Sequence, residues 1–174
     1  MTKESSFTAA QGMLYYMTIK EVIEPYCERI EIAGSVRRGR QECHDLDIVL
    51  IPKEGCIDKI KSLCLSHHPM FAGAGIPDPK WGEKLASFSW DGFVQTDLYF
   101  CDKHTFPVIY LIRTGSKEHN IKLTTLAKNK GMFLAAEGTL YADRLKAAAI
   151  HVKDEMDVFY NLGLPYIEPG EREA

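Results

Sequence analysis

The stretch that most constrains the fold is the apolar strand predicted for residues 45–51, because it opens with two acidic side chains. Asp45 and Asp47 stand at alternate positions, and the remaining residues of the stretch are all Leu, Ile or Val. Since successive side chains of a strand point to opposite faces, both carboxylates project from one face. Like charges this close disfavour joint ionisation unless a cation lies between them. The pattern predicts a cation site at this strand end, or, as the plainer alternative, a hydrated end.

A turn rich in glycine and arginine precedes this strand. Residues 29–33 alternate as a short strand and run into Gly34 and Ser35. Glycine can adopt positive φ or let a ligand approach the backbone closely. The guanidinium groups that follow, those of Arg37, Arg38 and Arg40, suit phosphate oxygens. The turn is therefore either an anion-binding site or an arginine-rich surface loop.

A third carboxylate stands within a second apolar strand. Residues 85–90 and 93–100 read as a hairpin with an Asp-Gly turn, and Asp97 lies on one face with Gln95 and Tyr99. An acid inside such a strand is costly unless it is paired or bound to metal. Two Mg²⁺ ions held by carboxylates can activate an attacking hydroxyl and stabilise a leaving pyrophosphate. The combination suggests nucleotidyl transfer.

The remaining patterns divide the chain of 174 residues into two parts. In the first part, helices are predicted near residues 15–26, with Thr8 as a possible cap, and over 57–65, followed by a Gly/Pro-rich loop at 72–82. In the second part, helices are predicted over residues 105–113, 117–130 and 153–162, with a short strand or turn at 138–141. The boundary predicted from this change is an α/β part at about 1–102 and a mostly helical part at about 103–174.

Charge and hydropathy limit the partners. The net charge of −3 argues at first against a nucleic-acid binder, yet residues 103–130 carry six Lys or Arg side chains against one acid. That stretch is either a solvated helix face or a contact surface for a phosphate backbone. No apolar run approaches the roughly 20 residues of a membrane helix, and the N-terminus lacks the order of a signal peptide. We therefore expect a soluble cytoplasmic protein with no membrane partner.

Several motifs, in order, resemble the X-family (polymerase-beta-like) DNA polymerases of the nucleotidyltransferase superfamily. They are the Gly-Ser-Val-Arg-Arg-Gly run at 34–39, the Asp-Leu-Asp at 45–47, and the isolated Asp97. The run at 114–123 is similar to the thumb motif of bacterial-type members, and residues 163–172 resemble the family's C-terminus. The resemblance covers nearly the whole chain. It implies an α/β (α+β) fold, with a palm of mixed sheet flanked by helices over 1–102 and a small, mostly helical thumb over 103–174.

The resemblance assigns the carboxylates to metal ions. Asp45 and Asp47 would bind two Mg²⁺ ions, for which Mn²⁺ can substitute. Asp97 would bind the catalytic ion and activate the primer 3′-hydroxyl.

The resemblance also assigns nucleotide contacts. Ser35 and Arg38 would hold the β- and γ-phosphates, and Gly34 would permit their approach. Gly115 would let the thumb backbone close over the nucleotide, and Asn120 would touch its base edge or sugar.

The chain departs from the family at the aromatic pair that crowds the sugar 2′ position. Ile112 and Arg113 stand there instead, which predicts weak discrimination between deoxyribonucleotides and ribonucleotides. Three lysines are expected to contact DNA or phosphate: Lys84, Lys117 and Lys122.

The activity implied is DNA-directed, gap-filling or repair-type synthesis on gapped or primed DNA with nucleoside triphosphates, by a monomer. The length leaves room for a palm and a thumb only, so we expect no lyase domain, helix-hairpin-helix module or phosphoesterase extension. This reduced form is the one expected of a virus or phage. The alternatives are a template-independent or non-DNA nucleotidyltransferase and a non-catalytic nucleic-acid-binding module.

Overall fold

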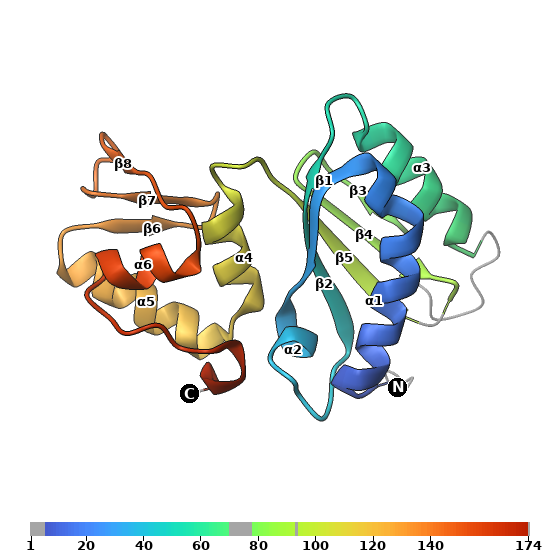
Figure 1. The fold of residues 1–174 in the computed structure, drawn as a ribbon, viewed down its shortest axis with the longest axis horizontal. Coiled ribbons are helices and arrows are strands. Elements are labelled where there is room, and N and C mark those ends of the chain that lie inside the picture. Colours follow the sequence, from blue (N-terminus) through green and yellow to red (C-terminus); the bar gives the residue numbers. More distant parts are fainter. Residues whose placement is uncertain (1–5, 70–77, 93, 174) are drawn as a thin grey trace.

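The computed structural model describes residues 6–69, 78–92 and 94–173, which build two sheets with helices around each (Figure 1). The elements around the larger sheet are α1 (Ala9–Ile23), η1 (Glu24–Tyr26), β1 (Cys27–Ile32), α2 (Gly34–Arg37), β2 (Asp45–Pro52), α3 (Ile57–His67), β3 (Lys80–Trp81), β4 (Leu85–Trp90) and β5 (Val94–Phe100). The elements around the smaller sheet are α4 (Phe106–Thr114), α5 (Lys117–Asn129), β6 (Phe133–Ala135), β7 (Thr139–Tyr141), β8 (Ala149–Ile150), α6 (Glu155–Asn161) and η2 (Pro169–Glu171). The predicted α/β class is confirmed.

The larger sheet has five strands in the order β1-β2-β5-β4-β3. Strands β2 and β5 run parallel, whereas the other neighbours are antiparallel, so the sheet is mixed as expected. Because β5 is the immediate neighbour of β2, Asp47 pairs with Asp97 and Asp45 pairs with Gln95. This register sets two of the three predicted carboxylates directly side by side.

The helix α1 begins where its sequence predicts. The Thr8 hydroxyl accepts a hydrogen bond from the Gln11 amide at 3.3 Å, and the Gln11 side chain accepts one from the Thr8 amide at 2.9 Å. This reciprocal cap satisfies backbone donors that have no partner within the helix. Ile19 and Ile23 are fully buried in the core that α1 shares with the sheet. Helices α1 and α3 cover one face of the larger sheet, whereas α4 lies against the other (Figure 1).

The alternation of β2 divides its side chains between these two faces, as predicted. Its even-numbered residues pack in the core with α1 and α3, while Val49 and Ile51 pack in the cluster that contains the first turn of α4. Asp45 and Asp47 share the odd-numbered face. Their carboxylates therefore look toward the second sheet and its helices.

The predicted hairpin is confirmed for β4 and the described part of β5. Asp91 and Gly92 both have positive φ, 49° and 76°, but Trp90 pairs with Val94, so three positions separate the paired ends and the predicted two-residue turn is wrong. Phe93 lies outside the described residues, so β5 begins at Val94.

The second half contains more strand than predicted. Helices α4, α5 and α6 appear within a few residues of their expected bounds, and the Ser116 hydroxyl caps α5 by accepting a hydrogen bond from the His119 amide at 3.2 Å. The strand-or-turn at 138–141 is β7. Its partners β6 and β8 were not predicted, because strands of three and two residues are too short to show a period of two.

The loop predicted at 72–82 is wrong at its end, where β3 pairs with β4; residues 72–77 lie outside the described ranges. No helix within the described ranges is long and apolar enough to cross a membrane.

Candidate active site

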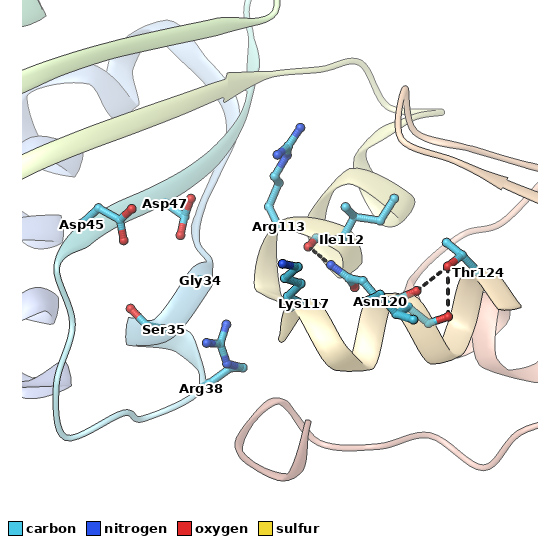
Figure 2. A pocket seen from close by; sticks show the side chains of 12 residues that line it. Gly34, Ser35, Arg38, Asp45, Asp47, Ile112, Arg113, Lys117, Asn120 and Thr124 are labelled. Atoms are coloured by element: carbon cyan, nitrogen blue, oxygen red, sulfur yellow. Dashed lines mark hydrogen bonds between the residues drawn. The ribbon is translucent and has the colours of Figure 1, made fainter. Parts of the chain in front are cut away.

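A cavity of about 440 Å³ lies between the β2 end of the larger sheet and helices α4 and α5. Figure 2 shows Asp45, Asp47 and Ser35 on one side of it and Asn120 on the other. Gly34, Arg38, Ile112, Arg113, Gly115 and Lys117 line it as well. Residues that are about 80 positions apart in the sequence thus face one space, and binding pockets often lie between packed parts of a fold in this way.

The three acids lie on the face of the sheet that looks toward this cavity. Asp47 and Asp97 are register partners, and Asp45 is two residues before Asp47 on the same strand. Burial, followed by the charges of Asp45 and then Asp97, raises the pKa of Asp47 to about 7, although a hydrogen bond from Tyr99 opposes the rise. At neutral pH the metal-free site therefore keeps Asp47 only partly ionised.

Hydroxyl groups already contact two of these acids. Ser87 Oγ donates a hydrogen bond to Asp97 Oδ1 at 2.5 Å. The Tyr99 hydroxyl lies 3.0 Å from Asp47 Oδ1 and 3.4 Å from Asp97 Oδ2. We did not single out Ser87 or Tyr99 from the sequence. The alternation of β5 put Tyr99 on the face of Asp97, but Ser87 could be found only from the β4–β5 register.

These side chains fit a hard divalent cation by their chemistry. Carboxylate oxygens are the ligands that Mg²⁺ prefers. Burial and then the charges of neighbouring carboxylates raise the pKa of Asp47, and a cation would neutralise those charges. Within the described residues, however, no three Asp, Glu, His or Cys side chains are drawn together closely enough to enclose an ion. Asp45 and Asp47 line the cavity, whereas Asp97 shares their face of the sheet but is not among the lining residues, so the candidate ligands form no closed cage.

Gly34 brings the turn of α2 directly against Asp47. Its φ is +60°, and a Cβ atom built on it would lie 2.0 Å from Asp47 Oδ2. Only glycine fits this contact, and the group that approaches Gly34 in this structure is the Asp47 carboxylate; the approach of a ligand stays a prediction. Beside it, the Ser35 hydroxyl is buried without a hydrogen-bond partner among the described residues.

Two of the three arginines of the turn share one acidic partner. Arg38 Nε donates to the Glu173 carboxylate at 2.7 Å, and its terminal nitrogen donates to the Thr114 carbonyl oxygen. Arg40 contacts the same carboxylate of Glu173 at 3.1 Å. A phosphate that binds Arg38 would have to compete with Glu173.

Arg37 faces away from the phosphate position inferred for the turn. It donates to both oxygens of Glu155, at 2.8 and 2.6 Å, and to the Thr114 hydroxyl at 2.6 Å, and it stacks 3.8 Å from the Tyr110 ring centroid. The fully buried Arg172 donates to the same Glu155 at 2.9 Å. Burial alone would raise the pKa of Glu155, but its hydrogen bonds to the two arginines hold it below its usual value. Arg37 therefore ties the α2 turn to α4 and α6, and its guanidinium is already bonded to carboxylate and hydroxyl oxygens.

Ile112 and Arg113, the residues at the position expected to crowd the sugar, point in different directions. The Ile112 carbonyl accepts a hydrogen bond from Asn120 Nδ2 at 2.7 Å, and its side chain packs on the core of the second half. Arg113 instead extends away from Lys117 (Figure 2), and its guanidinium lies 4.2 Å from the Tyr99 ring centroid. Asn120 Oδ1 is buried without a partner in the described part of the chain.

The three predicted lysines do not gather. Lys117 lines the cavity, while Lys84 lines another pocket, of about 310 Å³, beside Glu83 and Glu137. Lys122 lies one turn further along α5 and does not line the cavity. The structure therefore brings only Lys117 to the candidate site.

Comparisons with known proteins all find enzymes that are named for DNA synthesis. A family model described as DNA polymerase beta thumb matches residues 109–173. The chain is 30% identical over 144 residues to "DNA polymerase/3'-5' exonuclease PolX" of Bacillus subtilis, with 82% of the chain and 24% of that protein covered. It is 25% identical to human "DNA-directed DNA/RNA polymerase mu", with 83% and 36% covered. It is 31% identical over 81 residues to "DNA nucleotidylexotransferase" of Ambystoma mexicanum, with 47% and 16% covered. The chain thus spans about a third or less of these relatives.

Proposed function

The chain belongs to the X family of DNA polymerases, and on that premise we propose that it adds nucleotides to a primer 3′-hydroxyl. The observation that carries the proposal is the register of β2 and β5, which sets Asp47 beside Asp97 on the face that looks toward the thumb. In the reaction, a bond forms between the 3′-oxygen and the α-phosphorus. The bond from that phosphorus to the β-phosphate oxygen breaks, and pyrophosphate leaves.

The carboxylates would hold the divalent ions that X-family polymerases use. Asp45, Asp47 and Asp97 would bind two Mg²⁺ ions, with Mn²⁺ as a substitute. When bound, the ions supply positive charge to the attacking and leaving oxygens. Asp97, which Ser87 orients through a 2.5 Å hydrogen bond, would accept the proton of the 3′-hydroxyl.

The turn of α2 would hold the triphosphate. Ser35 lines the cavity, and its hydroxyl has no hydrogen-bond partner among the residues that the structure describes, so it would donate to a phosphate oxygen. Arg38 would exchange Glu173 for the β- and γ-phosphates, since a guanidinium binds both kinds of anion. Gly115, whose φ is +74°, approaches Arg38 closely and would let the thumb backbone lie over the nucleotide.

The sugar would meet Ile112 and Asn120 on the thumb side. Because the side chain of Arg113 is directed to Tyr99, only Ile112 is left to crowd the sugar, and we expect weak discrimination against ribonucleotides. A related protein carries "DNA/RNA polymerase" in its name, which agrees with this expectation. The palm at 1–102, the thumb at 103–174, the gap-filling preference and the monomeric state are parts of the same proposal.

A second candidate is template-independent addition to a DNA end. The similarity to a DNA nucleotidylexotransferase over 47% of the chain favours it. Both candidates use the same carboxylates, so template dependence distinguishes them.

Single-nucleotide extension tests the proposal. The protein is incubated with Mg²⁺ or Mn²⁺, a gapped DNA with a labelled primer, and each deoxynucleotide alone. We expect extension only by the nucleotide complementary to the template, and its loss in Asp97→Asn. Asp91→Asn, which changes an exposed turn residue in the same way, is the matched control and should retain activity. Extension that ignores the template would support the second candidate. DNA binding without extension would reject both.

A further inference from the structure

Tyr99 joins the thumb to the candidate metal ligands of the palm. Its hydroxyl lies 3.0 Å from Asp47 Oδ1 and 3.4 Å from Asp97 Oδ2, and its ring carries the Arg113 guanidinium at 4.2 Å. We propose that Tyr99 is a positioning residue that sets the two carboxylates for divalent-metal binding and is itself held by Arg113. This inference rests on the proposed function, because it takes these carboxylates as the metal ligands.

The hydroxyl contacts restrict how the carboxylates rotate. A phenol has one proton to donate, and the nearer acceptor is Asp47 Oδ1. Asp97 is contacted at its second oxygen as well, by Ser87 Oγ at 2.5 Å. Each carboxylate oxygen has more than one lone-pair site, so an oxygen that accepts this hydrogen bond can still bind a cation. Tyr99 and Ser87 therefore orient the ligands without occupying all their acceptor sites.

Arg113 supports the ring from the other domain. Arg113 comes from the last turn of α4, and Tyr99 lies in β5 of the larger sheet. The Nε atom of Arg113 is buried without a hydrogen-bond partner among the described residues, while the guanidinium lies over the Tyr99 ring and its charge also acts on Asp47. A cation over an aromatic face is attracted by the ring quadrupole. The orientation of the phenol thus depends on where α4 lies.

The expected size of the effect follows from other metal sites. Groups that hydrogen-bond a ligating carboxylate typically change metal affinity about 10- to 100-fold when they are removed. We expect Tyr99→Phe, which keeps the ring and the Arg113 stack, to raise the dissociation constant for Mn²⁺ about tenfold. Arg113→Lys, which keeps the positive charge that acts on Asp47 but removes the planar guanidinium from the ring, should raise it less, because the hydroxyl remains.

The test is a Mn²⁺ titration of the full chain, with free Mn²⁺ measured by electron paramagnetic resonance. Tyr16→Phe is the matched control, because the Tyr16 hydroxyl also donates a buried hydrogen bond, to the Ile30 carbonyl at 3.0 Å, in the palm core. Asp47→Asn removes a proposed metal ligand and so shows how much of the measured Mn²⁺ binding takes place at the candidate site. We expect a tenfold weaker affinity for Tyr99→Phe, an unchanged one for Tyr16→Phe, and loss of tight binding for Asp47→Asn.

The outcomes separate the two proposals. If Tyr99→Phe binds Mn²⁺ as tightly as Tyr16→Phe, Tyr99 has no positioning role, and the proposed polymerase function stands untouched. If wild-type protein shows no Mn²⁺ binding that depends on Asp47, the metal site fails and this inference fails with it. Should Tyr99→Phe unfold, which its melting temperature would show, a weaker affinity for Arg113→Lys supports the inference, and a dissociation constant equal to that of the wild type overturns it.

Discussion

Replacing Gly34 by alanine would put a methyl group against the carboxylate of Asp47. An ideal Cβ atom at Gly34 lies 2.0 Å from Asp47 Oδ2 and 2.8 Å from its Cγ, whereas unbonded carbon and oxygen atoms do not approach within 3.0 Å. The carboxylate or the α2 turn must move by about 1 Å. Misplacement by about 1 Å of a group that acts on the reacting atoms can reduce rates about 100-fold.

The same substitution also strains the backbone. The φ of Gly34 is +60°, and a residue with a Cβ atom pays about 1–2 kcal/mol in this left-handed region. In a protein of this size, 1 kcal/mol shifts the melting temperature by roughly 2–4 °C, so strain alone should lower it by about 2–8 °C. The predicted result is a modest loss of stability with a much larger loss of extension activity.

Gly55→Ala is the matched control for strain. Gly55 has φ of +70° in the loop between β2 and α3, and a Cβ atom there meets nothing within 4 Å. Both variants are compared by thermal melting and by kcat/KM for single-nucleotide extension. A Gly34→Ala protein that keeps activity within threefold of Gly55→Ala would refute the argument that Asp47 needs this glycine.

Competition between Glu173 and phosphate for Arg38 predicts that Glu173→Gln tightens nucleotide binding by up to about fivefold, the effect of about 1 kcal/mol for a partly exposed ion pair; calorimetry that finds an unchanged dissociation constant would contradict this. Burial and neighbouring carboxylates raise the pKa of Asp47 to about 7, so the metal-free folded state binds this proton more tightly than the unfolded state does. The free energy of unfolding in EDTA, measured by urea titration, should therefore fall as pH rises from about 4 to 7. This fall should be smaller for Asp47→Asn, and an equal fall would show that Asp47 does not carry the raised pKa. Ile112→Tyr should raise the preference for dATP over ATP about tenfold in kcat/KM, because the ring would crowd the sugar; a ratio equal to that of the wild type would count against Ile112 as the gate.

Local patterns predicted most of the elements around the larger sheet. The alternation of β2 placed Asp45 and Asp47 on one face, and the Asp-Gly turn predicted the hairpin of β4 and β5. The Thr8 cap marked the start of α1. These features depend on residues within a few positions of each other, so one sequence is enough to show them. The strands β6 and β8 escaped prediction because they are too short to carry a period.

Side-chain partners across the two domains could not be predicted. Arg37 and Arg38 are adjacent and chemically identical, yet one binds Glu155 and the other Glu173. Nothing in their local sequence shows which of the two arginines pairs with Glu155 and which lies at the candidate site. The direction of Arg113 toward Tyr99, rather than toward the sugar position beside Ile112, was equally inaccessible.

The sequence by itself determined which residue types can do the chemistry and on which face of its own strand each stands, because side-chain direction alternates with the backbone. The tertiary structure decided which of these faces meet. Asp97 is the neighbour of Asp47 because β5 pairs with β2 in parallel register, and the cavity exists because α4 and α5 pack opposite them. Such contacts join residues 50 to 80 positions apart, and their free energy comes from burial and charge pairing across the whole fold, which no local pattern records.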